Sequence, residues 1–233
     1  MHKIRKFLNK FGLDIHRYRP EPDIAKFWQN IGINTILDIG ANVGQFATEI
    51  RSKLPNAQIY SFEPLKECFE ALETSFGADP KFKAFNYALG EAEVEIAMHK
   101  SAYSPSSSIL AMSQTHKTLF PHTKEHTEEK IKIKKLDDVA RDLNLEKEIL
   151  IKVDVQGFED RVIAGGENTF QKGRAVIMET SFVELYENQP TFDDLYQKLK
   201  SLGFEYRGSL QQKIDKNTGG VISEDSMFIR KKF

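Results

Sequence analysis

A short glycine-containing segment carries the first residues that could bind a ligand. Residues 38–44 read D-I-G-A-N-V-G and follow an apolar, β-branched run. Gly40 allows a sharp turn that brings backbone N–H groups close to a ligand, and Gly44 allows tight contact between a strand and a helix. Asn42 stands where the pyrophosphate-binding pattern G-x-G-x-x-G has its middle glycine, and Asp38 would repel a phosphate. The segment therefore favours a ligand with an ammonium group over a dinucleotide.

A second acidic residue follows the next apolar run. Glu63 lies 19 residues after Gly44, directly after the run at 58–62. A carboxylate at the tip of the second strand can accept hydrogen bonds from both hydroxyls of a ribose. The alternative is a structural charge favoured by the dipole of the following helix. Asp38, the glycine turn and Glu63 together predict a ligand with an adenosine ribose and an amino-acid tail, which is S-adenosylmethionine.

A third segment, residues 151–159, reads I-K-V-D-V-Q-G-F-E. Side chains alternate along a strand, so Lys152, Asp154 and Gln156 share one face. Charges inside a parallel sheet need partners, and one interpretation is an internal ion pair. The other is a functional group at the carboxyl end of the strand, where ligands of open α/β sheets bind. The second interpretation is favoured for Asp154 because it lies beside the turn at Gly157; for Lys152 the two are balanced.

Glu179 ends the apolar run that follows, and it could meet Asp154 across neighbouring strand tips. Such a pair could bind a hard divalent cation such as Mg²⁺, with water completing the shell. It could equally act as a base and a hydrogen-bond acceptor for substrate. His116, His122 and His126 lie close together in sequence but lack the spacing of a zinc site, which favours a solvated or substrate-facing loop.

Apolar periodicity predicts the elements that position these residues. Strand, helix and strand alternate from residue 36 to residue 86, which requires a parallel sheet with right-handed crossovers. The strands are expected at 34–39, 58–62, 81–86, 149–155, 175–179, from 204 and at 226–230, and the helices at 22–31, 46–54, 65–76, 136–143, 158–170 and 192–202. The last two strands are expected to pair across Gly219-Gly220.

The middle of the chain breaks this rhythm with an insertion at about 91–135. The stretches 94–98 and 131–133 alternate apolar and polar residues, as half-exposed antiparallel strands do. The stretch 101–130 between them has no clear periodicity. A long irregular segment of this kind in a compact domain is typical of a binding loop or lid, and we interpret it as a cover over the carboxyl edge of the sheet.

Composition excludes several classes of protein. The 233 residues include 33 Lys+Arg and 34 Asp+Glu, and a net charge of −1 argues against a general nucleic-acid binder. The lone Cys68 cannot form an internal disulfide, which favours a reducing compartment and a cytoplasmic location. No apolar run approaches the roughly 20 residues of a membrane span. Trp28 is expected to anchor an N-terminal helix to the domain.

The first 32 residues form a basic, helical lead-in to a domain expected at 33–233. Ile4, Phe7, Leu8 and Phe11 share one helical face. This short stripe favours a helix packed over the domain. The alternative is weak peripheral contact with a membrane or a partner.

Taken together, the motifs resemble the FkbM family of S-adenosylmethionine-dependent methyltransferases. The matching segments are D-I-G-A-N-V-G-Q-F-A (38–47), F-E-P (62–64), N-Y-A-L-G-E (86–91), S-S-S-I-L (106–110), I-K-V-D-V-Q-G-F-E (151–159) and G-F-E-Y (203–206). The resemblance implies a Rossmann-like, doubly wound α/β fold with a mostly parallel seven-stranded sheet whose last strand is antiparallel. It also implies O-methylation of a hydroxyl on a sugar, glycan or polyketide-like small molecule.

The resemblance further implies a cofactor site. The methionine part is expected at Asp38, Gly40, Asn42 and Gly44, with Gln45 of the same motif as a further contact. Glu63 is expected to hold the ribose, and the segment from Asn86 to Ala88 the region of the adenine.

An alcohol is a poor nucleophile at neutral pH, so methyl transfer to it needs a base or a metal. Asp154 is the first candidate for the base, Glu179 the second, and Lys152 a candidate catalytic neighbour. Two other functions stay open. One is a non-catalytic module that senses the cofactor or scaffolds a partner; the other, disfavoured by Asn42, is a nicotinamide-dependent oxidoreductase.

Overall fold

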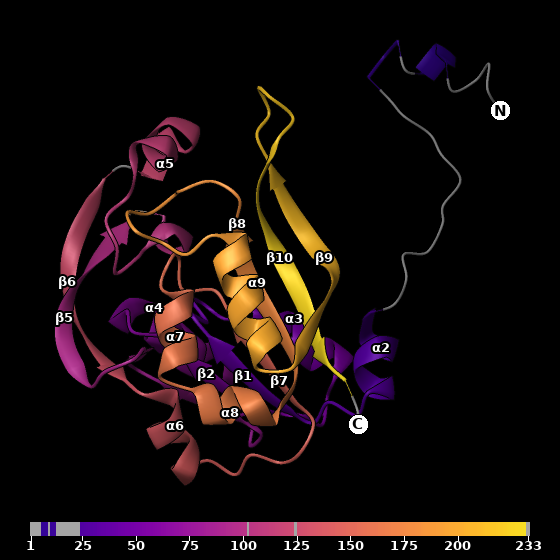
Figure 1. The fold of residues 1–233 in the computed structure, drawn as a ribbon, viewed down its shortest axis with the longest axis vertical. Coiled ribbons are helices and arrows are strands. Elements are labelled where there is room, and N and C mark those ends of the chain that lie inside the picture. The colour runs from indigo at the N-terminus through magenta and orange to yellow at the C-terminus, as the bar shows by residue number, and fades with distance from the viewer. Residues whose placement is uncertain (1–5, 9, 13–23, 102, 124, 232–233) are drawn as a thin grey trace.

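The computed structural model describes residues 6–8, 10–12, 24–101, 103–123 and 125–231. Its centre is a seven-stranded sheet in the order β3-β2-β1-β7-β8-β10-β9 (Figure 1). The strands are β1 Thr35–Ile39, β2 Gln58–Phe62, β3 Phe82–Phe85, β7 Ile149–Val153, β8 Gly173–Ser181, β9 Phe204–Ile214 and β10 Val221–Arg230. Only β10 runs antiparallel to its neighbours β8 and β9, as expected. The chain leaves the centre at β1 towards β3 and returns at β7, so the strand order reverses between β1 and β7. Open α/β sheets bind ligands at such a point.

Helices cover both faces of this sheet, which confirms the doubly wound arrangement. On one face, α2 Ile24–Asn30 and α3 Gln45–Lys53 pack against alternate strand residues such as Ile36 and Leu150. On the other, α6 Leu136–Val139, α7 Glu159–Ala164, α8 Glu167–Lys172 and α9 Phe192–Ser201 pack against the intervening residues, such as Leu37 and Ile151. Trp28 of α2 is 1% exposed and anchors its helix, as predicted.

The helix α4 Lys66–Phe76 closes the β2–β3 edge of the sheet. The ring of Phe76 stacks on that of Phe82, with the centroids 4.5 Å apart. Cys68 is buried, and burial raises the pKa of its thiol to about 11. This cysteine therefore fills the core and is not poised as a nucleophile.

The region expected as an insertion supplies two of the three strands of a second sheet, seen beside the main one in Figure 1. Its order is β4-β6-β5, with β4 Ala88–Leu89, β5 Val94–Ser101 and β6 His126–Lys134, and β5 pairs antiparallel with β6 as expected. The expectation of an irregular stretch over 101–130 is partly wrong. It holds two 3-10 turns, Ser104–Ser106 and Pro121–Thr123, and the helix α5 Gln114–Leu119, and β6 begins within it. These elements are short and largely polar, so periodicity does not reveal them.

Two of the expected helices are broken. The helix expected at 158–170 divides into α7 and α8 at Gly165-Gly166. A Cβ atom on Gly165 would lie 1.8 Å from the carbonyl oxygen of Gly90, so the chain at this point packs directly on backbone. The helix expected at 136–143 ends as α6 at Val139 and continues as a 3-10 turn.

Much of the basic lead-in, including Ile4, lies outside the described residues. Phe7 and Phe11 are described, and they are 60% and 67% exposed. Their rings contact each other with centroids 5.3 Å apart. The expected packing of these two side chains over the domain is therefore wrong.

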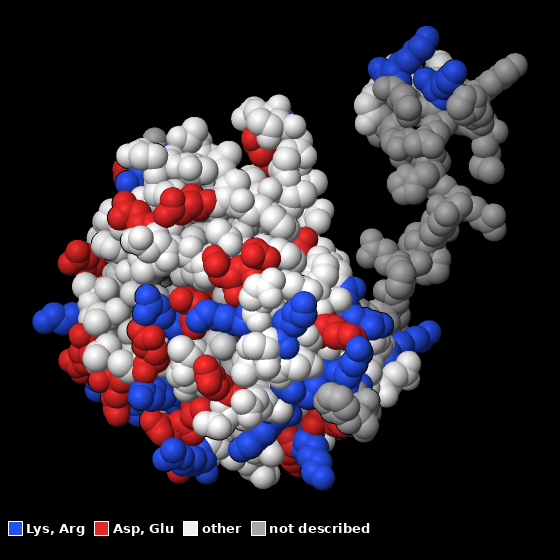
Figure 2. All heavy atoms as spheres, viewed as in Figure 1, with Lys and Arg blue, Asp and Glu red and all other residues white. Residues whose placement is uncertain are grey.

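The surface carries both signs of charge. On the face seen in Figure 2, Lys and Arg alternate with Asp and Glu over the lower part, and charged side chains are sparse around α5 and the β9–β10 hairpin. This face therefore presents no continuous basic surface. Within the described ranges, no helix combines the length and apolar character needed to cross a membrane.

Candidate active site

A cavity of about 530 Å³ opens at the carboxyl ends of β1, β2 and β7, where the strand order reverses. Its walls come from all three motif segments and from the insertion. Seven of the residues expected in the site line it: Gly40, Asn42, Gln45, Glu63, Ala88, Lys152 and Asp154. The motifs that are far apart in sequence thus converge on one cavity of the size that small-molecule ligands occupy.

The glycine turn after β1 is fixed by close backbone contacts. The N–H groups of Gly40 and Ala41 both donate to the carbonyl of Phe62, over 3.0 and 3.1 Å. Gly40 has φ +81°, and a Cβ there would lie 1.9 Å from the carbonyl oxygen of Asp154. Gly40 is therefore needed where the loops after β1 and β7 cross, and it also lines the cavity.

Gly44 is not among the residues that line the cavity. It has φ +90°, and a Cβ there would lie 2.8 Å from the ring of Phe76 and 2.9 Å from Leu72. The structure therefore gives Gly44 a packing role between α3 and α4.

Glu63 is buried and braces the glycine turn. Its Oε2 accepts the N–H of Asn42 and its Oε1 accepts the N–H of Leu65, both over 2.8 Å. Burial raises the pKa of Glu63 to about 7, although these hydrogen bonds oppose the shift. Asn86 lies outside the lining and donates from Nδ2 to the carbonyls of Glu63 and Pro64. Asn86 therefore supports the Glu63 loop, and only Ala88 of the expected adenine segment reaches the cavity.

Asp38 lies beneath the cavity floor, fully buried on the face of the sheet that carries α3. Its register partners are Ser61 on β2 and Lys152 on β7. The Ser61 hydroxyl donates to Oδ2 over 3.3 Å, and Oδ1 has no hydrogen-bond partner among the described residues. Burial raises the pKa of Asp38 to about 6, against the opposing charge of Lys152. A buried carboxylate oxygen without a donor is a group that a cationic ligand would stabilise.

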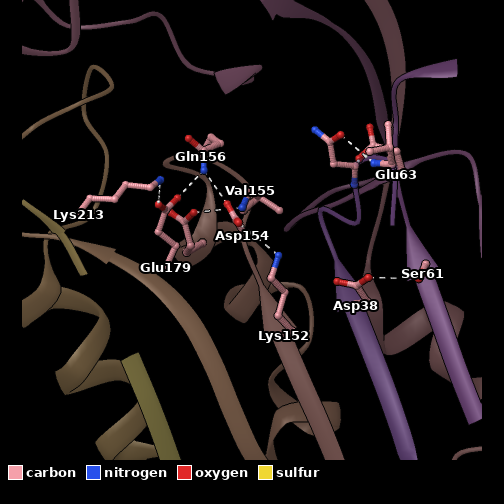
Figure 3. A network of polar contacts seen from close by, with 12 residues as sticks. Asp38, Ser61, Glu63, Lys152, Asp154, Val155, Gln156, Glu179 and Lys213 are labelled. Atoms are coloured by element: carbon pink, nitrogen blue, oxygen red, sulfur yellow. Dashed lines mark hydrogen bonds and ion pairs between the residues drawn. The ribbon is translucent and has the colours of Figure 1, made fainter. Parts of the chain in front are cut away.

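A polar network joins the tips of β7, β8 and β9 (Figure 3). Asp154 Oδ2 lies 3.3 Å from Lys152 Nζ, and its Oδ1 accepts the amide of Gln156 over 2.6 Å. The same amide contacts Glu179, whose Oε1 accepts Lys213 Nζ over 2.6 Å. The expected meeting of Asp154 and Glu179 is therefore present, and each carboxyl has its own lysine.

The two carboxyls differ in their affinity for a proton. Burial opposes ionisation of Asp154, but the charges of Lys152 and Lys213 and a hydrogen bond from Gln156 lower its pKa. Burial and the negative charge of Asp154 raise the pKa of Glu179 to about 7. A hydrogen bond joins the two carboxyls, so a proton shared by the pair resides on Glu179. Such a pair titrates near neutral pH.

Several residues that sequence reasoning did not place in the site hold this network. Gln156 has φ +55°, and its Oε1 accepts the hydroxyl of Tyr186 over 2.8 Å. Its carbonyl accepts Ser108 Oγ over 2.6 Å, which ties the insertion to the strand tip. The family motif S-S-S-I-L at residues 106–110 could have indicated a role for Ser108. Lys213 had no signal, because only the start of its strand was predicted.

The carboxyl of Glu159 stabilises the turn after β7 by hydrogen bonds to its backbone. Its Oε1 accepts the N–H groups of Val155 and Gly157, over 3.2 and 3.1 Å. Burial raises the pKa of Glu159 to about 8. The carboxyl thus positions the Gln156-Gly157 turn and is not among the residues that line the cavity.

Of the three histidines at 116, 122 and 126, His116 is buried. His116 is 2% exposed, its Nε2 lies 3.0 Å from Thr123 Oγ1, and burial lowers its pKa to about 4. The expectation of a solvated or substrate-facing position is therefore wrong for His116, because α5 packs it inward. Across the described part of the chain, no three His, Cys, Asp or Glu residues are grouped to hold a metal ion. Asp154 and Glu179 fit a divalent cation poorly, because lysine ammonium groups already contact their oxygens.

Several curated relatives of this chain are named as methyltransferases. It is 31% identical over 160 residues to the 2-O-methyltransferase NoeI of Sinorhizobium fredii, covering 66% of each chain. It is 28% identical over 169 residues to the methyltransferase sdnD of Sordaria araneosa, covering 62% of this chain and 65% of that one. It is 29% identical over 149 residues to the hexuronic acid methyltransferase AglP of Haloferax volcanii, covering 63% and 55%. The chain thus spans just under two thirds of the first two relatives and about half of the third.

Among solved structures, the chain aligns with magnesium protoporphyrin IX methyltransferase from Synechocystis, at 9% identity and a TM-score of 0.47, over 90% of this chain and 77% of that one. The model of the methyltransferase FkbM domain matches residues 38–206, which include the tips of β1, β2, β7 and β8. This chain therefore belongs to the FkbM methyltransferase domain family.

Proposed function

We propose that this protein is an S-adenosylmethionine-dependent O-methyltransferase that acts on a hydroxyl of a sugar, glycan or polyketide-like small molecule. One observation carries the proposal. Family motifs on β1, β2 and β7 converge on one cavity, and Asp154, which meets Glu179 at the tips of β7 and β8, lines its wall. The names of NoeI and AglP, a 2-O-methyltransferase and a hexuronic acid methyltransferase, support an oxygen acceptor on a sugar.

The residues on the β1 and β2 side fit the cofactor. When bound, S-adenosylmethionine supplies a methyl group that its sulfonium already activates. Asp38 has an unpaired, buried oxygen that a positive charge would stabilise. Each Glu63 oxygen accepts one backbone N–H and keeps lone-pair capacity for a ribose hydroxyl. A ligand that brings positive charge to this wall favours the ionised form of both carboxyls.

The residues on the β7 and β8 side suit the removal of a proton. Asp154 lines the cavity and accepts the acceptor hydroxyl's proton as the oxygen attacks. Lys152 holds Asp154 in its ionised form. A proton already on Glu179 hinders this step, because the proton that Asp154 accepts could then not pass to Glu179, the carboxyl with the higher pKa. The reactive form of the pair is therefore the fully ionised one.

The insertion excludes water from the cavity and orients the glycine turn after β1. Tyr103, Ser104 and Ser107 line the cavity from the segment after β5. Ser104 Oγ donates to Asn42 Oδ1 over 3.2 Å, which closes the insertion onto the glycine turn. A closed wall keeps the reacting groups in line and lowers the local dielectric.

The direct test supplies purified protein with methyl-labelled S-adenosylmethionine and fractionated glycans and lipids from cells. Label in a hydroxyl-bearing acceptor supports the proposal. Cofactor binding without transfer to any fraction would instead favour a sensor or scaffold. A parallel reaction with chelator addresses a divalent cation at Asp154 and Glu179; we expect full activity.

A further inference from the structure

A second, smaller cavity of about 200 Å³ adjoins the first at the tip of β8. Each residue that lines it has a polar side chain: Asp154, Glu179, Gln211, Gln212, Lys213, Ser223, Glu224 and Asp225. The first cavity, in contrast, has many apolar residues in its wall, among them Phe46, Met98 and Phe158. Four residues border both spaces, namely Asp154, Gln211, Lys213 and Asp225, so a group in the smaller cavity lies beside the candidate base.

The β9–β10 hairpin forms most of this smaller cavity. Asp225 pairs with Glu179, and Ser223 with Ser181, in the β10–β8 register. The β10–β9 pairing shifts register at Val221/Ser223 and Glu224/Ser226, so the hairpin departs from regular pairing where it borders this cavity. The cavity is thus made by a segment outside the family motifs that bind the cofactor.

Glu224 is already fixed by hydrogen bonds within the wall. Its Oε1 accepts the hydroxyls of Tyr206 and Ser226, each over 2.7 Å, and its Oε2 accepts the amide of Gln212 over 3.1 Å. Glu224 is 4% exposed, and these donors lower its pKa against the effect of burial. The wall therefore keeps a buried, ionised carboxylate in one orientation.

Ser223 is the unsatisfied member of the wall. It is 1% exposed, and its hydroxyl has no hydrogen-bond partner among the residues described. Buried hydroxyls normally have a partner, because leaving one unpaired costs free energy. A ligand group in the cavity would supply that partner.

We propose that the smaller cavity holds one uncharged, polyhydroxylated unit of the acceptor, about the size of a monosaccharide, and presents its hydroxyl to Asp154. This inference rests on the proposed function. The volume is below that of a pocket for a drug-sized ligand, so the cavity takes one ring and not a longer chain. Carboxylates, amides and a serine hydroxyl together match hydroxyls, which both donate and accept.

Charge selects against anionic acceptors at this cavity. Four carboxyls line it, from Asp154, Glu179, Glu224 and Asp225, against the single ammonium of Lys213. A carboxylate or phosphate on the ring would face like charges without enough cations to pair with. The site therefore differs in its expected preference from the hexuronic acid acceptor named for the relative AglP.

The test compares three probes with the same ring: methyl α-D-glucopyranoside, its glucuronic acid counterpart and glucose 6-phosphate. Labelled methyl transfer measures kcat/KM, and saturation-transfer NMR measures binding to protein loaded with S-adenosylhomocysteine. We expect the neutral glycoside to be favoured at least tenfold in both measurements. A preference for either anionic probe, or binding of none of the three to the loaded protein, overturns the proposal.

Two variants connect the result to the cavity. Ser223→Ala is expected to raise KM for the neutral glycoside about fivefold, with kcat within about twofold and the melting temperature of the free protein not lowered. A lower melting temperature with unchanged KM would assign Ser223 a structural role and overturn its part in binding.

Asp225→Asn is expected to reduce the discrimination against the glucuronide about threefold or more. Ser201→Ala, on the exposed end of α9, is the matched control and should change none of these values.

Calorimetry with S-adenosylhomocysteine separates this inference from the proposed function. Binding of this compound with no preference for the neutral ring contradicts the acceptor cavity alone. No binding of the compound contradicts the proposed function itself.

Discussion

Two pairs of carboxyls stand at the same edge of the sheet in different surroundings. Asp38 and Glu63, at the tips of β1 and β2, accept hydrogen bonds from a serine hydroxyl and backbone N–H groups, and neither has an ion pair among the described residues. Asp154 and Glu179, at the tips of β7 and β8, each contact a lysine ammonium.

We infer from this difference in partners that the first pair serves cofactor binding and the second pair serves proton transfer. Burial raises the pKa of Asp38 to about 6 and of Glu63 to about 7, so the first pair gains most from a ligand that brings positive charge. The second pair already has its cations, and its two carboxyls differ in their affinity for a proton. The first pair is therefore suited to hold a cationic cofactor, and the second to take a proton.

The largest effect is expected at the second pair. Asp154→Asn removes the group that accepts the hydroxyl proton and keeps its shape, so we expect kcat to fall about 10²- to 10⁴-fold. Binding of S-adenosylmethionine, measured by calorimetry, should stay within about threefold of wild type. Normal turnover in this variant would remove Asp154 from the chemistry.

At the first pair we expect the opposite pattern. Asp38→Asn removes the buried negative charge, and the Kd for S-adenosylmethionine should rise about 10- to 100-fold because the attraction between that charge and the cationic ligand is lost. At saturating cofactor, kcat should change much less than in Asp154→Asn. Asp193→Asn, at the exposed start of α9, is the control. Unchanged cofactor affinity in Asp38→Asn would contradict the division between the two pairs.

The pH dependence of the reaction should report the second pair. Because Glu179 must lose its proton, kcat at saturating cofactor should rise about tenfold per pH unit below a bend near pH 7 and level off above it. Saturating cofactor is needed because burial also raises the pKa of Glu63 to about 7, and its titration would affect cofactor binding. In Glu179→Gln the proton-linked bend should disappear, with kcat lowered about tenfold. A wild-type profile that is flat between pH 5.5 and 8 would exclude this role for Glu179.

The smallest effect is expected at Lys213. Its ammonium lowers the pKa of Glu179, so Lys213→Met should move the bend in the pH profile upward by about half a unit or more. Lys216→Met, in the turn of the same hairpin, should leave the bend in place. A downward shift in Lys213→Met would contradict the assignment of the bend to Glu179.

Most of the fold, and the convergence of the motif segments on one cavity, were predictable because they depend on local patterns. Apolar runs that end close to Asp38, Glu63 and Asp154 alternate with helical patterns, and this alternation predicts three strand ends at one edge of the sheet. The structure has the ends of β1, β2 and β7 at that edge. The meeting of Asp154 and Glu179 followed from the neighbouring positions of their strands.

The remaining features depend on contacts between distant segments. Gly44 lies in the motif, but its need for glycine comes from Phe76 on another helix. The break between α7 and α8 comes from the contact of Gly165 with the Gly90 backbone. Lys213 reaches Glu179 only through the register of a hairpin with shifts in its pairing, which no local pattern reveals.

Calorimetry on the wild-type protein with S-adenosylmethionine, S-adenosylhomocysteine and NAD tests the central claim most directly, namely that the cavity beside Asp38 and Glu63 holds a cationic nucleoside cofactor. The account predicts saturable binding of the first two compounds and none of NAD at the same concentrations. Tight binding of NAD with no heat from the other two would contradict it.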